Sequence, residues 1–129
     1  MKTIAALLLL ALMSSYTYKI TCDTNLLYGK WLLVDSYDED DVDIDTLLNM
    51  KIVDHQKASL KFLRGGYVNY DDGEHTTREY YTVDRGRCRV ETMGLTSMTQ
   101  RMFYIQHLDE KYLIGLERGK IYFYEKEEE

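Results

Sequence analysis

The sequence predicts an all-β domain whose strands follow one another as an antiparallel meander and close into a small barrel of eight, or at most nine, strands. Three observations support this prediction. Short segments rich in β-branched and aromatic residues succeed one another from about residue 31 to residue 124. Short turns join most of them, and short connections make consecutive strands antiparallel neighbours. A meander of this size hides its edge strands best by closing on itself.

The elements follow in order along the chain. The first strand is expected over 31–37, with Trp31 and Leu33 on one face and Leu32 and Val34 on the other. One short helical turn is expected over 43–49, because acids begin this segment and leucines lie in its second half. A loop is expected over 94–98. The remaining strand candidates, each bounded by turn residues, are 51–53, 59–63, 67–70, 77–83, 88–93, 99–108, 112–116 and 120–124.

The N-terminus has the composition of an export signal. Lys2 precedes an uncharged apolar run over 4–13, and small residues follow at 14, 15 and 17. The run is shorter than the roughly 20 apolar residues that cross a bilayer. We therefore expect a signal peptide over 1–17, a single domain over 18–129, and a secreted protein, extracellular or periplasmic. An uncleaved anchor, a buried core helix and lipid attachment at Cys22 are the alternatives.

Charge and cysteine content limit the partners and the compartment. The net charge of −6 disfavours nucleic acid and anionic membranes as partners. The two cysteines, Cys22 and Cys88, are expected to form one disulfide in an oxidising compartment, with two separate buried thiols as the alternative.

No motif points to catalysis. The histidines, His55, His75 and His107, have no metal-binding spacing, and neither a hydrolase nucleophile motif nor a phosphate-binding loop occurs. The acidic run 38–45 places aspartates at the first three ligand positions of an EF-hand, but the required glycine and the final glutamate are missing. We expect a solvated acidic loop here, with a weak, irregular Ca²⁺ site at an open barrel rim as the alternative. We expect a protein that is not an enzyme and holds no cofactor or metal.

The motif Gly29-Lys30-Trp31 opens the first strand. Together with the meander and the export signal, it resembles the lipocalins and the wider calycin group, especially the compact lipocalin-like domains of secreted bacterial proteins. The resemblance covers about residues 26–126 and implies that Trp31 plugs the closed end of the barrel. It also implies an arginine packed across that tryptophan, for which Arg118 is the candidate. The Thr-Asp-Tyr turn of the family is absent.

Two functions are compatible with these features. The first is a non-catalytic secreted binding protein that holds a small apolar or amphipathic molecule in the barrel. Its candidate ligand-binding residues are Trp31, Tyr67, Tyr81, Phe103, Tyr112 and Tyr122. The alternative is a secreted protein-interaction module, such as a cysteine-protease inhibitor resembling the staphostatins. Its candidate inhibitory loop is Met93, Gly94, Leu95, Thr96 and Ser97. In either case we expect a monomer that does not insert into membranes.

Overall fold

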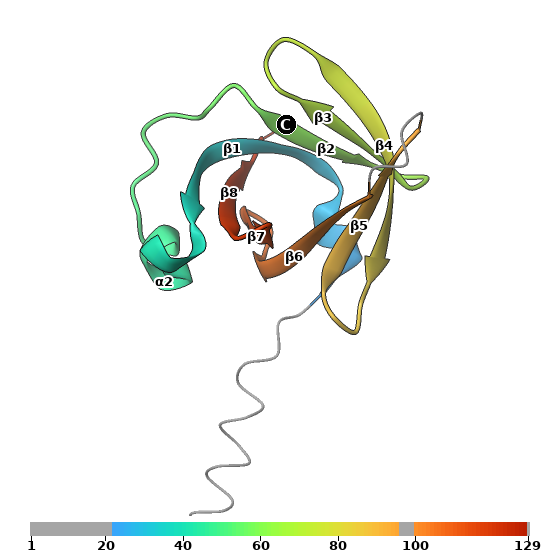
Figure 1. Ribbon diagram of the computed structural model, residues 1–129. Coiled ribbons are helices and arrows are strands. Elements are labelled where there is room, and N and C mark those ends of the chain that lie inside the picture. The colour runs from blue at the N-terminus through green and yellow to red at the C-terminus, as the bar shows by residue number, and fades with distance from the viewer. Residues whose placement is uncertain (1–21, 96–99, 129) are drawn as a thin grey trace, which may run out of the picture.

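Eight antiparallel strands form a closed barrel in the computed structural model, which describes residues 22–95 and 100–128 (Figure 1). Each strand pairs with the next along the chain, and the last pairs with the first. The strands are β1 (Gly29–Asp38), β2 (Ser59–Leu63), β3 (Tyr67–Asp71), β4 (Thr76–Asp84), β5 (Arg89–Gly94), β6 (Gln100–Leu108), β7 (Tyr112–Glu117) and β8 (Lys120–Lys126). The predicted eight-stranded meander is thereby confirmed.

The prediction of a strand over 51–53 was wrong. These residues belong to an irregular connection that leads into β2. Ile52 packs against hydrophobic side chains outside the barrel, whereas Val53 is 87% exposed. A ninth strand has no edge to join, because β1 already pairs with β2 on one side and β8 on the other.

The predicted helical turn is α2 (Ile44–Leu48), which follows the short 3-10 helix η2 (Glu39–Asp41). The Asp43 carboxylate caps α2 by accepting a hydrogen bond from the Thr46 backbone N–H at 2.8 Å. Helix α2 lies outside the barrel beside the end of β1 (Figure 1). None of the helices in the described ranges combines the length and the apolar character that a membrane span requires.

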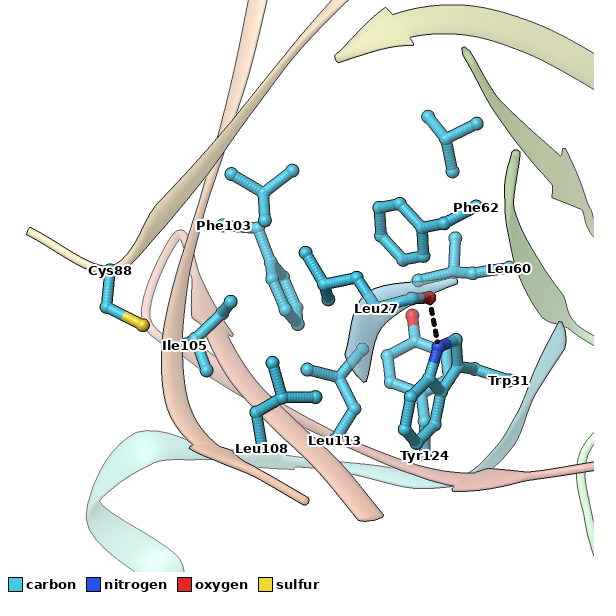
Figure 2. Packing of buried hydrophobic residues seen from close by; sticks show 12 residues of the cluster. Leu27, Trp31, Leu60, Phe62, Cys88, Phe103, Ile105, Leu108, Leu113 and Tyr124 are labelled. Carbon is cyan, nitrogen blue, oxygen red and sulfur yellow. Dashed lines mark hydrogen bonds between the residues drawn. The ribbon is translucent and has the colours of Figure 1, made fainter. Parts of the chain in front are cut away.

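The alternation of side chains along each strand separates two cores. In β8, Ile121 and Phe123 face outward, whereas Tyr122 and Tyr124 face the barrel interior. The outer core lies under α2 and is formed by Val34, Leu47, Ile114, Ile121 and Phe123. The inner core, shown in Figure 2, is formed by Leu27, Trp31, Leu60, Phe62, Val68, Cys88, Val90, Phe103, Ile105, Leu108, Leu113 and Tyr124.

One end of the barrel is closed by a 3-10 helix that the sequence analysis did not anticipate, η1 (Thr24–Leu27). Leu27 is 1% exposed, and its carbonyl accepts a hydrogen bond from Trp31 Nε1 at 2.9 Å (Figure 2). The expected disulfide between Cys22 and Cys88 is formed, with the two Cα atoms 5.4 Å apart. It ties the segment before η1 to the turn that leads into β5.

Candidate functional site

Trp31 lies at the closed end and has no exposed surface. The Lys126 ammonium, 5.2 Å from the centre of its ring, occupies the place expected for Arg118. The strand register explains this correction, because Trp31 pairs directly with Lys126. Arg118 instead lies in the turn between β7 and β8, at the other end of β8. Trp31 and its neighbours therefore lie at the closed end of the barrel, where the resemblance places the tryptophan.

Three other predicted ligand residues also belong to the barrel interior. Tyr81, Phe103 and Tyr122 pack with the inner core. Tyr81 stacks edge-on against Phe62 with ring centres 5.2 Å apart. Tyr122 lies nearer the other end of the barrel, where it lines an open pocket.

The remaining two predicted ligand residues lie on the outer surface. Tyr67 packs beside Tyr80, with ring centres 5.1 Å apart. Tyr112 packs in the same way on Phe123, at 5.4 Å, beside the outer core. The structure thus does not bring the six predicted residues together into one site.

The open end of the barrel carries a pocket instead. Because the strands are antiparallel, β3, β5 and β7 all end on the side of the barrel opposite η1. A pocket of about 420 Å³ lies there, lined by Arg101, Glu117, Arg118, Lys120 and Tyr122. Three of these five residues are cationic, although the whole chain carries a net charge of −6.

The groups behind this pocket act on one another electrostatically. The Arg101 guanidinium lies over the Tyr70 ring, 4.7 Å from its centre. Burial, together with the nearby Glu117 carboxylate, raises the pKa of Tyr70 to about 12. Burial also raises the pKa of Glu117, and the Arg101 and Arg118 charges oppose that shift. Burial and the neighbouring tyrosines Tyr70 and Tyr122 hold the pKa of Tyr124 well above its usual value.

Two further polar side chains are buried in the same part of the wall. Glu79 and Thr92 are 7% and 6% exposed. Within the described residues, Glu79 Oε2 and Thr92 Oγ1 have no hydrogen-bond partner. A buried polar atom without a partner costs about 1–3 kcal/mol. The register places Thr92 opposite Arg101 on the neighbouring strand, and Glu79 on β4 is close enough to Arg101 and Glu117 to raise the pKa of both. Neither side chain lines the pocket itself, but both belong to the interior wall near Arg101.

This polar cluster was not predicted, because the expected ligand-binding residues were chosen for their aromatic side chains. The signal was present in the alternation of the strands. Counting two residues on from a buried position gives Thr92 after Val90, and counting two back from Phe103 gives Arg101. Two such steps along β7 lead from the buried Leu113 through Gly115 to Glu117.

The candidate inhibitory loop is described only in part. Met93 and Leu95 are about half exposed, whereas Gly94 belongs to β5 and pairs with Glu79. Thr96 and Ser97 lie outside the described residues.

Two of the three histidines pair with carboxylates. His55 Nε2 lies 3.0 Å from Glu125 Oε1, and His107 Nε2 lies 2.6 Å from Asp109 Oδ2. No group of three or more metal-ligating side chains occurs within 22–95 and 100–128.

The fold is shared with a known bacterial protein. No protein-family model matches the sequence, and no curated protein matches it. Among solved structures, the chain is similar to the crystal structure of a lipocalin-like protein from Bacteroides uniformis ATCC 8492, with a TM-score of 0.59 and 17% sequence identity. The match covers 79% of this chain and 99% of the other. The chain therefore has the lipocalin-like fold.

Proposed function

We propose that the protein is a non-catalytic binding protein for a small amphipathic molecule, which it holds by an anionic group at the open end of the barrel. The observation that carries this proposal is the gathering of Arg101, Arg118 and Lys120 around one pocket of an acidic protein. Pocket walls of low dielectric strengthen such charges relative to the same groups in water. A carboxylate or a similar anion is the complementary ligand group.

The interior limits the apolar part of the ligand. The closed half of the barrel is packed with the inner core, so a long chain cannot lie along the barrel axis. A short chain or ring fits against Tyr122 and the aromatic ring of Tyr70 beside Arg101. A medium-chain carboxylate supplies both the anionic group and an apolar part that does not need to enter the packed half of the barrel.

Glu79 and Thr92 favour a hydroxyl group near the anionic end. A hydroxyl donates one hydrogen bond and accepts others, so it can serve both the Glu79 carboxylate and the Thr92 hydroxyl. Both atoms are otherwise unpaired within the described residues. We therefore expect 3-hydroxydecanoate to bind more tightly than decanoate.

Isothermal titration calorimetry of the disulfide-bonded protein tests this proposal. Decanoate should bind at least about 10-fold more tightly than decyltrimethylammonium, and Arg101→Gln should weaken decanoate binding about 10- to 100-fold, as expected for a charge-assisted hydrogen bond. Lys61→Gln is the matched control, because Lys61 is exposed on β2 and does not line the pocket. Equal binding of the two amphiphiles, or an Arg101→Gln variant that binds like the wild type, would contradict the proposal.

We also propose that the protein is exported and that residues 1–17 are removed. The Cys22–Cys88 disulfide supports an oxidising compartment. Intact-mass measurement of protein recovered from outside the cytoplasm should give the mass of a chain that begins at residue 18, with one disulfide. A full-length chain with two free thiols would contradict it.

A further inference from the structure

Exposed apolar side chains gather on the outer face of β4, β5 and β6. Across the described residues, seven large hydrophobic side chains are exposed, and five of these belong to this face or to the end of its β5–β6 connection. They are 38–49% exposed and comprise Tyr80, Met93, Leu95, Met102 and Tyr104. Several large apolar side chains exposed on one face of a protein indicate an interaction site, and tyrosine and methionine are enriched in protein interfaces.

We call this face the β4–β6 face, and its outer side is not packed against α2. Helix α2 covers the outer side of β7, β8 and β1, whereas no helix of the described chain lies over β4, β5 and β6 (Figure 1). The β4–β6 face also carries a pocket of about 200 Å³, whose lining includes Tyr80, Glu91 and Met93 on this face and Thr92 behind it.

A cation stands at one end of the face. Arg78 lies two residues before Tyr80 on β4, toward the open end of the barrel. Its guanidinium lies 5.5 Å from the centre of the Tyr67 ring, and its Nε donates to Asn69 Oδ1 at 3.0 Å. No carboxylate of the described residues forms an ion pair with Arg78, so its charge is available to a partner.

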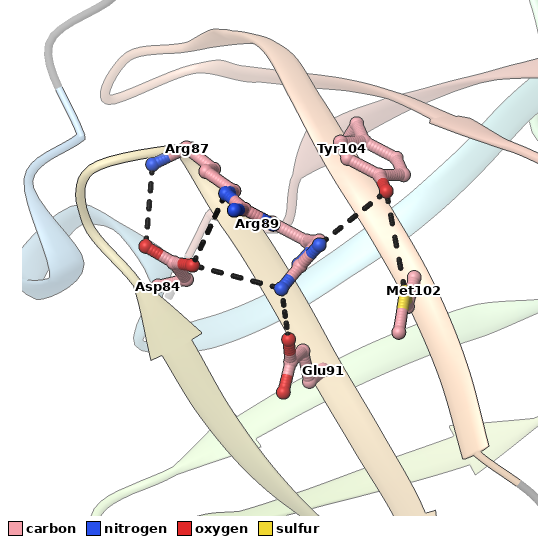
Figure 3. A network of polar contacts seen from close by, with 6 residues as sticks. All are labelled: Asp84, Arg87, Arg89, Glu91, Met102 and Tyr104. Atoms are coloured by element: carbon pink, nitrogen blue, oxygen red, sulfur yellow. Dashed lines mark hydrogen bonds and ion pairs between the residues drawn. The ribbon is translucent and has the colours of Figure 1, made fainter.

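The Glu91 carboxylate, which can accept an ion pair, lies on the other side of the Tyr80–Met93 pair from Arg78. Arg89 lies between two carboxylates, 3.6 Å from Asp84 Oδ2 and in contact with Glu91 Oε1 (Figure 3). Arg87 also approaches Asp84. Glu91 shares Arg89 with Asp84 through its Oε1, and no ion pair within the described chain engages Glu91 Oε2.

We infer that the β4–β6 face binds a second copy of the chain across a two-fold axis. An axis that lies between the two faces and crosses the strands at the Tyr80–Met93 pair turns one copy end for end relative to the other. Arg78 lies two residues from the axis on one side, and the paired residues Thr82 and Glu91 lie two residues from it on the other side. The rotation therefore brings Arg78 of each copy opposite Thr82 and Glu91 of the other copy. Each dimer gains two ion pairs between Arg78 and Glu91 around a centre of tyrosine and methionine.

The charge distribution favours the β4–β6 face over the acidic regions as the contact between two copies of the chain. The protein carries a net charge of −6, and a run of acids lies at the end of β1 and around η2 and α2. Contact through those acidic regions would bring like charges together. The β4–β6 face is close to neutral, and it lies on the barrel wall, so the pocket at each open end stays accessible in the dimer.

Analytical ultracentrifugation of the disulfide-bonded protein from about 1 to 500 µM tests this inference. The wild type should show a concentration-dependent monomer–dimer equilibrium, and Arg78→Glu and Glu91→Arg should each weaken dimerisation at least about 10-fold, because each places like charges opposite one another. An equimolar mixture of the two variants should form a heterodimer, because one chain then carries acids at both positions and the other carries cations.

A second pair of variants keeps the test decisive if Glu91→Arg does not fold. Tyr80→Lys should abolish dimerisation, whereas Val53→Lys, the same change at an exposed apolar residue away from the face, should leave it unchanged. A wild type that stays monomeric throughout the range, as expected from the sequence, would overturn the inference. So would a folded mixture that fails to associate, or equal effects of Tyr80→Lys and Val53→Lys.

Discussion

Gly115 measures how completely the middle of the barrel interior is filled. It lies on the inner face of β7, where an added Cβ would overlap three carbon atoms of the Phe103 ring. The ring has little room to move, because Phe103 is 7% exposed and packs edge-on against Tyr124, with ring centres 6.4 Å apart. Gly115→Ala should therefore force the ring or the strand out of place.

The size of the effect follows from two opposing contributions. Overpacking a well-filled core costs about 1–3 kcal/mol. The loss of backbone freedom in the unfolded chain when glycine becomes alanine returns about 0.4–1 kcal/mol. A net loss of about 1–2 kcal/mol in the free energy of unfolding remains. With a urea dependence of about 2 kcal/mol/M, the unfolding midpoint should fall by about 0.5–1 M.

Urea unfolding followed by Trp31 fluorescence measures this shift. Gly86→Ala is the control, because Gly86 does not have a positive φ and a Cβ there would make an ordinary contact of 3.5 Å with Asp84 Oδ1. The double variant Gly115→Ala/Phe103→Leu should recover part of the lost stability. Wild-type stability in the single Gly115→Ala variant would refute the description of a filled barrel interior around Phe103.

Three further predictions concern the closed end and the pocket. Replacing Cys22 and Cys88 by serine removes a cross-link that spans 66 residues and should lower the free energy of unfolding by about 4 kcal/mol in urea titrations; a loss below about 1 kcal/mol would contradict the role given to the bridge. Trp31→Phe leaves the buried Leu27 carbonyl without its donor and should cost about 1–3 kcal/mol or more, measured in the same way by tyrosine fluorescence, and an unchanged midpoint would speak against it. Because Glu117 binds its proton more tightly in the folded state, its contribution to stability should fall as the pH rises from about 4.5 through its raised folded pKa. Glu117→Gln should flatten the pH dependence of the free energy of unfolding. Parallel pH profiles for the wild type and Glu117→Gln would disprove this prediction.

The strands could be predicted from the sequence because their alternation is local. Ile114 and Leu116 face the outer core while Leu113 faces the inner one, as the pattern of apolar residues requires. The prediction of a strand over 51–53 failed because a short β-branched run has the same sequence pattern whether it pairs in a sheet or packs its isoleucine under a helix. The 3-10 helix η1 carried one signal that could have been used, the capping residue Asp23, whose side chain accepts the Asn25 N–H.

The site was harder to predict because it depends on strand register. Tyr67 and Tyr112 have the residue type of a ligand site, but the register turns them outward, whereas it brings Arg101 and Glu117 to the mouth of the barrel. Lys126 approaches Trp31 only because the last strand pairs with the first across the closure of the barrel. Such long-range pairing is not encoded in any short motif.

A heteronuclear NMR titration with decanoate shows whether the ligand binds at the open end while Trp31 only closes the other end. Chemical-shift changes should be largest for Arg101, Glu117 and Tyr122, with the indole N–H of Trp31 unmoved, because that group stays bonded to Leu27 at the far end. A titration in which the Trp31 indole moves most, or in which none of the pocket residues moves, would contradict the account.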